Sequence, residues 1–277
     1  MTVSVAQKRI AFRKLHEAGC FVLPNPWDLG SARLLQSLGF KALASTSAGF
    51  AWSTGRADYG LTCEEVVGHL QQLCAGTELP LNADFENGFA DAPRAVAANV
   101  ARALEAGVAG LSIENRAVNA AKPLYDDALA VERIAAARAA VDAVDKNAIL
   151  VARCEGFLVG EADLAATIRR LVAFAAAGAD CLYAPGLKTK EQISEVVRAV
   201  APKPVNVLVG NAPGFSVSEL AELGVRRVSV GGALARAAWG GFMRAAQEIA
   251  THGTFSEFAH GHPGGELQKI LGQPRPG

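Results

Sequence analysis

The sequence lacks the features that mark secreted, membrane-spanning and nucleic-acid-binding proteins. Its five cysteines (Cys20, Cys63, Cys74, Cys154 and Cys181) are odd in number and form no CxxC pair, which predicts free thiols in a reducing cytoplasm rather than a disulfide framework. No apolar run approaches the ~20 residues needed to span a bilayer, and the first residues lack the apolar stretch of a signal peptide. Lys+Arg and Asp+Glu both number 27 and no basic run occurs, so neither nucleic acid nor a membrane surface is expected as a partner.

Histidine is scarce where catalysis would need it. Three of the five histidines (His252, His260 and His262) lie in the C-terminal region, and His16 and His69 fall in predicted helices. No histidine follows a predicted strand. This placement argues against a histidine-based zinc site and against a Ser-His-Asp triad.

What the chain has in abundance is one repeated unit, in a sequence that is 51% hydrophobic. A helix rich in Ala, Leu and Glu ends at a glycine, as at Gly19, Gly39, Gly107, Gly178 and Gly224, and a short β-rich run follows. Strands are predicted at Phe21–Pro24, Ala42–Thr46, Leu81–Asp84, Gly110–Glu114, Ile149–Arg153, Cys181–Ala184, Val205–Val209 and Arg227–Val230.

Alternating strands and helices predict a parallel sheet covered by helices, and eight units in about 250 residues match an α/β (β/α)8 TIM barrel. A doubly wound open sheet is the alternative, but no GxGxxG follows the first strand. Helices are expected at Ala92–Ala106 and Ala162–Ala177. The chain is interpreted as a single barrel domain over 1–277, with a C-terminal helical extension from about 241 that contains a helix at Gly241–Thr251 and a short one in GELQKIL.

Two carboxylates close the third predicted strand. Asp84 and Glu86 stand two residues apart, and residues i and i+2 of a strand face the same side. Adjacent carboxylates resist joint ionisation unless a proton or cation lies between them. Because only oxygen ligands are on offer, the expected cation is Mg²⁺ or Mn²⁺.

Other polar side chains follow the remaining strands, where barrel enzymes build their active sites. The candidates are Asn25, Ser45, Thr46, Ser47, Asp58, Glu114, Arg153, Glu155, Tyr183 and Asn206. They form an acidic cluster opposite one arginine. Such a cluster suits a hard metal that is chelated by a small anionic acid.

These residues carry a family resemblance. The segments GRADYG, DFENGF, GLSIEN and VARCEGF, in this order, resemble the isocitrate lyase / phosphoenolpyruvate mutase superfamily over nearly the whole chain. The resemblance implies a magnesium-dependent barrel enzyme that breaks or forms a C–C or P–C bond next to the carboxylate of a 2-oxo or 2-hydroxy acid, through an enolate. It also implies a homo-oligomer, dimer or tetramer, in which C-terminal helices are exchanged between subunits.

The resemblance assigns roles position by position. Asp84 matches the direct metal ligand, and Glu86 stands where a second Asp is usual. Glu114 and Asp58 match further acids of the metal site and are expected to be catalytic. Arg153 matches the arginine that grips the substrate anion, and Asn206 a strand-seven asparagine of some members. Thr46, Ser47 and Ala48 match the loop whose N–H groups hold the substrate carboxylate.

Some residues of this chain differ from the family's motifs, and these differences reduce the number of reactions that are expected. Isocitrate and methylisocitrate lyases carry a Cys-Gly-His loop after the strand-four glutamate, whereas Asn115–Pro123 here has neither Cys nor His, and Pro185 replaces a glutamate. The chain is therefore not expected to have isocitrate lyase or methylisocitrate lyase activity. Asn119 and Lys122 are the polar candidates in this loop, and the segment from Asn115 to Tyr125 is expected to close over the substrate. Oxaloacetate decarboxylase and phosphonopyruvate-type hydrolase or mutase activities stay open as alternatives.

Simpler interpretations stand beside these. Glu114 could form only an ion pair with Arg153, and Cys154 is expected to be a buried structural thiol. Gly231 and Gly232 could cradle the phosphate of a metal-independent phosphosugar enzyme, or could merely form a tight turn. A barrel that binds its ligand but has lost turnover is the remaining alternative.

Overall fold

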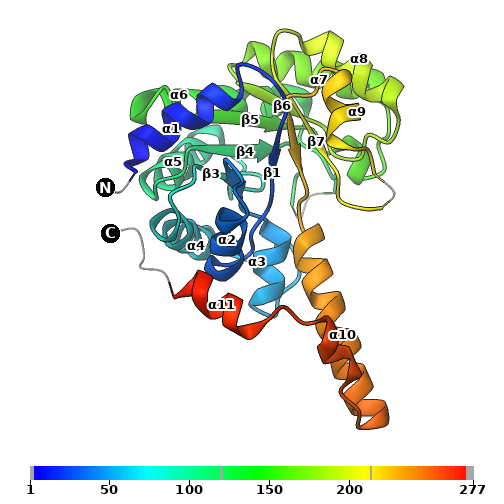
Figure 1. Ribbon diagram of the computed structural model, residues 1–277. Helices are drawn as coiled ribbons and strands as arrows, with labels where there is room; N and C mark the ends of the chain where they lie inside the picture. The colour runs from blue at the N-terminus through cyan, green and yellow to red at the C-terminus, as the bar shows by residue number, and fades with distance from the viewer. Residues whose placement is uncertain (1–2, 119–120, 213, 273–277) are drawn as a thin grey trace.

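The chain folds into a barrel of eight parallel strands. The computed structural model describes residues 3–118, 121–212 and 214–272 (Figure 1). The strands run in the order β1-β8-β7-β6-β5-β4-β3-β2. Their bounds are β1 Phe21–Leu23, β2 Leu43–Ala44, β3 Leu81–Asp84, β4 Gly110–Glu114, β5 Ile149–Arg153, β6 Cys181–Tyr183, β7 Val205–Leu208 and β8 Arg227–Ser229.

The two ends of the sheet meet at β1 and β2. The Ala44 N–H donates to the carbonyl of Pro24 at 3.0 Å, just beyond the end of β1. The Asn25 side chain reinforces this junction: its amide donates to the Ser45 carbonyl, and its oxygen accepts the N–H groups of Val230 and Gly231, each at 2.9 Å. These bonds bring the ends of β1, β2 and β8 together, and the predicted (β/α)8 barrel is confirmed.

The predicted strands are all present. β3, β4 and β5 have the predicted bounds, and four others end one residue early. β2 keeps only Leu43 and Ala44 of the predicted Ala42–Thr46, because Thr46 already caps the helix that follows: its hydroxyl accepts the N–H of Gly49 at 3.2 Å.

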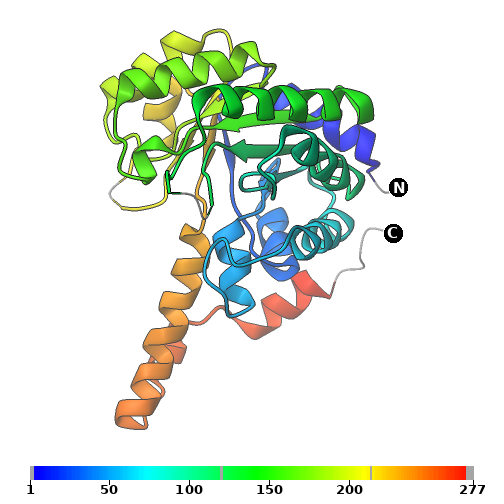
Figure 2. The same cartoon turned by 180° about the vertical axis from the view of Figure 1, so that it is seen from behind.

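Helices cover the outer face of the barrel, as Figure 2 shows for α6 and α7 over β5 and β6. Their bounds are α1 Val5–Leu15, α2 Leu29–Ser37, α3 Ser47–Ser53, α4 Cys63–Gly76, α5 Pro93–Glu105, α6 Asp127–Val144, α7 Leu164–Ala176, α8 Lys190–Val200, α9 Val217–Glu222, α10 Ala233–His252 and α11 Gly264–Leu271, with 3₁₀ turns η1 Gly156–Leu158 and η2 Ser256–His260.

Helix α1 precedes the barrel and packs at the amino ends of its strands. Phe12 is fully buried in a cluster of side chains that includes Leu23, Ile149 and Val151. The Lys8 ammonium donates to backbone carbonyls at the end of α4, and the Arg9 guanidinium donates to those of Leu104 and Val108. Helix α1 therefore closes the barrel at the amino ends of its strands. A small molecule can enter only at the carboxyl ends of the strands.

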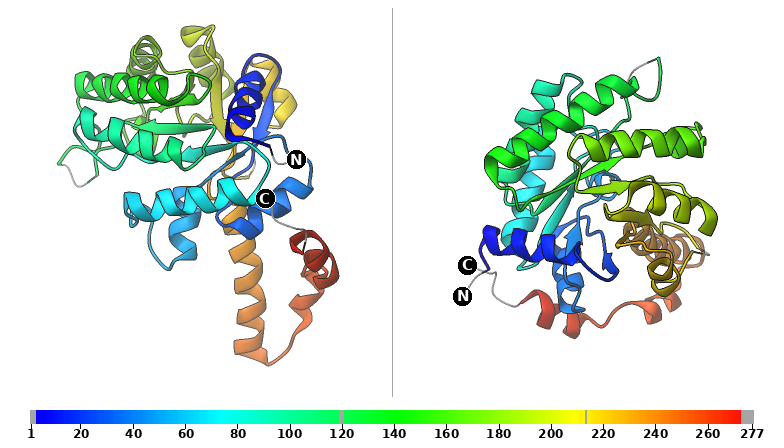
Figure 3. Two further views of the ribbon diagram at one scale, coloured as in Figure 1. Left: turned by 90° about the vertical axis from the view of Figure 1, so that its left-hand side faces the viewer. Right: turned by 90° about the horizontal axis from the view of Figure 1, so that it is seen from above.

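The C-terminal region differs from the expectation. Helix α10 begins at Ala233 rather than Gly241 and continues through Gly240 and Gly241. A glycine inside a helix costs only about 1 kcal/mol, which the alanine-rich flanks tolerate. Figures 1 and 3 show α10 projecting from the barrel, with η2 returning beside it and α11 packing on α2 of the same chain.

All five cysteines are free thiols. In the described residues, no helix combines the length and apolar character needed to cross a bilayer.

Candidate active site

A cavity of about 140 Å³ opens at the carboxyl ends of the strands. Pockets for drug-sized ligands hold about 300–1,000 Å³, so this one suits a small acid better than a nucleotide. Six of the residues to which the family resemblance assigns a role line it: Thr46, Ser47, Ala48, Asp58, Asp84 and Arg153. Glu86, Glu114 and Asn206 do not belong to the lining and lie behind it, each at most 5% exposed.

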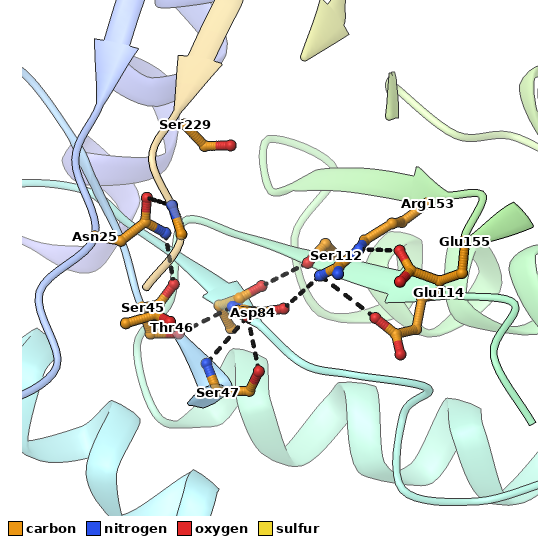
Figure 4. Close-up of polar contacts among 12 residues, drawn as sticks. Asn25, Ser45, Thr46, Ser47, Asp84, Ser112, Glu114, Arg153, Glu155 and Ser229 are labelled. Atoms are coloured by element: carbon orange, nitrogen blue, oxygen red, sulfur yellow. Dashed lines mark hydrogen bonds and ion pairs between the residues drawn. The ribbon is translucent and has the colours of Figure 1, made fainter. Parts of the chain in front are cut away.

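Asp84 is the central carboxylate of the site (Figure 4). It ends β3, so its side chain stands at the mouth while its N–H donates to the Ser45 hydroxyl at 2.9 Å. One oxygen accepts the N–H of Ser47 at 3.0 Å and its hydroxyl at 3.1 Å. The other accepts from Nη1 of Arg153 at 3.2 Å. The carboxylate is therefore fixed in orientation by two loops and a guanidinium.

Glu86 reaches the site through a turn and not, as predicted, through strand alternation. The strand ends at Asp84. The backbone of Glu86 has a φ of 46°, in the left-handed region that residues other than glycine rarely adopt. Its Oε1 is buried without a hydrogen-bond partner among the described residues. Burial, together with the charges of Asp84 and Glu114, raises the pKa of this carboxyl to about 9.

The strained turn is held from behind by α6. The Arg133 guanidinium, 1% exposed, donates to the carbonyls of Asn87, Ala90 and Asp91 and stacks over the Tyr125 ring at 4.0 Å. Backbone strain of this kind persists only where surrounding contacts enforce it, and it concentrates at functional sites.

Arg153 joins three acids. Its Nη1 lies 3.2 Å from Asp84 and 3.4 Å from Glu114, and its Nε donates to Glu155. The ion pair between Glu114 and Arg153 that the simpler interpretation predicted is therefore present. Burial raises the pKa of Glu114, while the positive charge of Arg153 opposes that rise. In the part of the chain that is described, Nη2 has no acceptor, so it can face a ligand in the cavity.

The loop between α3 and α4 supplies Asp58 and Tyr59. Asp58 lines the cavity from this solvent-accessible loop, and partial burial together with the charge of Asp84 raises its pKa. The Tyr59 hydroxyl, which was not predicted as a site group, donates to Glu114 Oε1 at 2.6 Å. The Arg116 guanidinium stacks over the Tyr59 ring at 4.3 Å, which links this loop to the loop after β4.

The segment from Asn115 to Tyr125 folds back on itself. The Tyr125 N–H donates to the carbonyl of Asn115 at 3.0 Å, and the Ala117 N–H to that of Pro123 at 2.9 Å. Asn119 lies outside the described residues. Lys122 is exposed, pairs with Asp126 at 3.2 Å and does not line the cavity. The catalytic role of this loop stays a prediction.

Three other predictions have clear structural outcomes. Cys154 is fully buried, as expected of a structural thiol. The N–H of Gly231 is taken by Asn25 and its φ is 52°, which favours the tight turn over the phosphate cradle. Asn206 stands behind the cavity wall, where it accepts from Arg227 Nε and donates to the Ser229 hydroxyl, both at 2.9 Å.

The acidic side chains are better suited to a metal ion that keeps several water ligands than to one coordinated by protein atoms alone. Among the described residues, no three Asp, Glu, His or Cys side chains converge into a preformed metal site. Mg²⁺, however, usually takes one or two carboxylates and keeps several waters. Asp84 offers a directed carboxylate, and the unpaired buried oxygen of Glu86 together with its raised pKa marks a place where positive charge is missing.

Four polar lining residues were not among the predicted candidates: Asn82, Ser112, Arg227 and Ser229. Asn25, Ser45 and Tyr183 were candidates because they follow predicted strands, and they also line the cavity. Arg227 could have been noticed as a charged residue at an inward-facing position of an apolar strand. Nothing in the sequence indicates how deep in the barrel it lies.

Comparisons with known proteins agree with this geometry. The family model for phosphoenolpyruvate phosphomutase matches residues 12–250. A provisionally assigned lyase/mutase from Burkholderia cenocepacia J2315 has a crystal structure that is 48% identical, with a TM-score of 0.95 and 98% of each chain covered.

Two further relatives have named activities. The oxaloacetate decarboxylase of Pseudomonas putida strain GB-1 is 30% identical over 79% of this chain and 77% of its own. The structure of oxaloacetate acetylhydrolase in complex with the product oxalate is 27% identical, with a TM-score of 0.86, over 98% of this chain and 95% of that one. The chain thus belongs to the phosphoenolpyruvate phosphomutase family, within the superfamily that also contains the isocitrate lyases, and is a lyase/mutase-like enzyme.

Proposed function

We propose that this enzyme uses Mg²⁺, or Mn²⁺, to cleave or form a C–C or P–C bond next to the carboxylate of a small 2-oxo or 2-hydroxy acid. The observation that carries the proposal is the acid cluster around the cavity, in which Glu86 holds an unpaired buried oxygen beside Asp84. Without a cation, burying this much negative charge is unfavourable.

Asp84 is the proposed direct ligand, and Glu86, Glu114 and Asp58 complete the site. Glu86 and Glu114 lie behind the cavity wall, so their contact is proposed to pass through waters that the metal retains. When bound, Mg²⁺ would act as a Lewis acid that stabilises negative charge developing on the substrate oxygen.

The chain's own groups position the acid. Arg153 lines the cavity, and its Nη2, which has no acceptor among the described residues, is proposed to bind the substrate anion through a charge-assisted hydrogen bond. Thr46, Ser47 and Ala48 form the adjoining wall. The Ser47 N–H already donates to Asp84, so the other two residues are the proposed contacts for the substrate carboxylate. The segment from Asn115 to Tyr125 is proposed to exclude water.

The test is a pyruvate-release assay with and without Mg²⁺. The substrates are oxaloacetate, phosphonopyruvate, methylisocitrate and C3-substituted malates. Metal-dependent turnover of one of them, abolished by a chelator, would support the proposal and name the bond. Turnover that a chelator leaves unchanged would contradict it. Mg²⁺-dependent oxalate binding without turnover of any compound would favour the ligand-binding barrel.

We also propose that the enzyme is a cytoplasmic homo-oligomer, dimer or tetramer. The arm formed by α10 and η2 carries Trp239, Phe242, Met243, Phe255 and Phe258, each at least 41% exposed. Exposed aromatic side chains concentrated on one projecting element are typical of an interface. A second copy of the chain is the proposed partner. Helix α11 packs on α2 of its own chain here, and the proposal is that in the assembly the C-terminal extension is exchanged between subunits.

A further inference from the structure

Tyr59 joins two loops at the mouth of the barrel. It belongs to the loop between α3 and α4, residues 54–62, and its hydroxyl donates to Glu114 Oε1 at 2.6 Å. The Arg116 guanidinium, from the loop after β4, stacks over the Tyr59 ring at 4.3 Å. In the described part of the chain, no other hydrogen bond, ion pair or ring contact joins loop 54–62 to elements beyond α3 and α4.

The backbone of Tyr59 is strained. Its φ of 62° lies in the left-handed region, which a residue with a large side chain rarely adopts and which persists only where surrounding contacts enforce it. Residues 53–58 before it are exposed, whereas Tyr59 is half-buried. The chain therefore extends into solvent after α3 and returns to the barrel at Tyr59.

Glu114 depends on this donor because it is almost inaccessible to water. It ends β4 and is 2% exposed. Its Oε2 lies 3.4 Å from Nη1 of Arg153, so Tyr59 and Arg153 contact different oxygens of one carboxylate. A buried carboxylate oxygen that loses its donor is unfavourable. The phenol and the guanidinium together therefore fix the orientation of the Glu114 carboxylate.

The same tyrosine limits the position of Asp58. Asp58 lines the cavity, and its Oδ1 accepts the N–H of Tyr59 at 3.1 Å. Because the two residues are neighbours in the chain, a bond that holds Tyr59 at the mouth also holds Asp58 there. Tyr59 does not itself line the cavity. It contacts two acids of the proposed metal site from behind and is not placed to contact a substrate.

We propose that Tyr59 is a positioning residue, whose hydroxyl orients the Glu114 carboxylate and holds loop 54–62, with Asp58, against the mouth of the cavity. This role rests on the proposed function, in which Glu114 and Asp58 serve the metal site. The hydrogen bond itself requires no metal, so it can be tested separately.

The first measurement follows the loop in chelator. The peptide bond after Arg56 lies in the exposed part of loop 54–62 and is a trypsin site, and its cleavage requires local opening of the loop. Mass spectrometry of the full-length enzyme gives the cleavage rate. Tyr59→Phe keeps the aromatic ring but loses the donor. It should be cleaved about 10-fold faster, the effect expected for the loss of one hydrogen bond to a charged group.

A double-mutant cycle assigns this effect to Glu114. Glu114→Met keeps the length of the side chain but removes both oxygens, so it should speed cleavage as Tyr59→Phe does, and the double variant should be no faster. Ser53→Ala is the matched control, because it removes an exposed hydroxyl that donates to the Phe50 carbonyl, and it should be cleaved as the wild type is. Unchanged cleavage in Tyr59→Phe would overturn the proposal, as would additive effects in the double variant.

The second measurement separates positioning of Glu114 from attachment of the loop. Arg116→Met loses the stacking contact but leaves the Tyr59 hydroxyl bonded to Glu114, so cleavage should rise only about 2- to 5-fold. Calorimetry with oxalate and Mg²⁺ should show about 10-fold weaker binding in Tyr59→Phe and nearly wild-type binding in Arg116→Met. Equal weakening in both variants would show that loop attachment alone matters and would overturn the positioning role.

The two measurements also distinguish this proposal from the proposed function. A wild type that binds oxalate no better with Mg²⁺ would contradict the proposed metal site. The cleavage rates in chelator would still decide whether Tyr59 holds the loop through Glu114. Should Glu114→Met not fold, the comparison of Tyr59→Phe with Arg116→Met decides the matter.

Discussion

At the scale of single residues, the main feature of the site is a group of carboxyl side chains. The fold holds them close together, although their negative charges repel one another. Asp84 is held by Ser47 and Arg153, while Glu86 is placed by a left-handed turn. Both arrangements are consistent with the proposed metal ion, whose positive charge would offset that of the carboxylates.

Replacing Asp84 tests its proposed role as the direct metal ligand. We expect Asp84→Asn to weaken Mg²⁺-dependent oxalate binding by at least about 10- to 100-fold, because the amide lacks the charge that a hard cation needs. Calorimetric titration of oxalate measures this, with circular dichroism to confirm folding. Asp142→Asn, at an exposed position near the end of α6 that does not line the cavity, serves as the control and should bind oxalate as the wild type does. Unchanged binding in Asp84→Asn would refute the assignment.

Glu86 makes stability depend on pH. Its pKa is raised from 4.5 to about 9, so between these values the folded state keeps a proton that the unfolded state has lost. The unfolding free energy of the metal-free enzyme should therefore fall as pH rises through this window, by an amount on the order of 2–4 kcal/mol.

Denaturant titrations in chelator at about pH 5 and about pH 9 measure this fall. Glu86→Gln should show a smaller fall, because its amide does not titrate. Mg²⁺ should also reduce the fall, since binding of the cation favours the ionised carboxylate. Equal pH dependence in wild type and Glu86→Gln would show that other groups cause it.

At the scale of elements, the turn after β3 depends on α6. Arg133 donates to three carbonyls of this turn and stacks on Tyr125, whose hydroxyl accepts from Asn87 at 3.0 Å and donates to Asp91. Through Arg133, helix α6 thus contacts both the loop that contains Glu86 and the loop that ends at Tyr125.

We expect Arg133→Met to lower the unfolding free energy by about 3 kcal/mol, because it leaves buried carbonyls without donors. It should also weaken Mg²⁺-dependent oxalate binding, since the Glu86 turn loses its support. Thermal and denaturant unfolding measure the first effect and calorimetry the second. Arg169→Met, an exposed position on α7, should change stability by no more than about 0.5 kcal/mol. A stable Arg133→Met variant with normal oxalate binding would contradict this account of the turn.

At the scale of the whole molecule, the barrel is closed at its amino end by α1 and extended at its carboxyl end by the arm of α10 and η2 (Figures 1 and 3). Trp239 and Phe242 contact each other edge to face at 5.7 Å, yet Phe242 is 59% exposed. Such a surface is unfavourable in a monomer in water.

We expect Phe242→Glu to shift the enzyme from oligomer to monomer, because a charge would be buried in the interface. Light scattering after size-exclusion chromatography gives the mass. Glu248→Gln, on the same helix but bonded to Ser256 and Thr254, is not expected to change it. A monomeric wild type at micromolar concentration would contradict the proposed assembly.

Much of the fold follows from local patterns in the sequence. Helices that end at glycine and short apolar runs predicted eight strands, three of them with the observed bounds, because hydrophobic periodicity and helix capping act over a few residues. Asp58, Asp84 and Arg153 could be placed at the cavity because parallel strands end at one side of the barrel, whereas Glu114, at the end of β4, lies behind the cavity lining.

What the sequence alone determined is therefore the barrel and the kinds of residue that follow its strands. Only the tertiary structure decided that Glu86 enters by a strained turn, that Asn206 stands behind the cavity wall and that Lys122 lies away from it. The surroundings of Arg227 were the hardest to predict from the sequence. Its neutral partners Asn206 and Asn82 lie on β7 and β3, and only the folded barrel brings these strands to it. Such pairings join residues distant in the chain, and local periodicity carries no information about them.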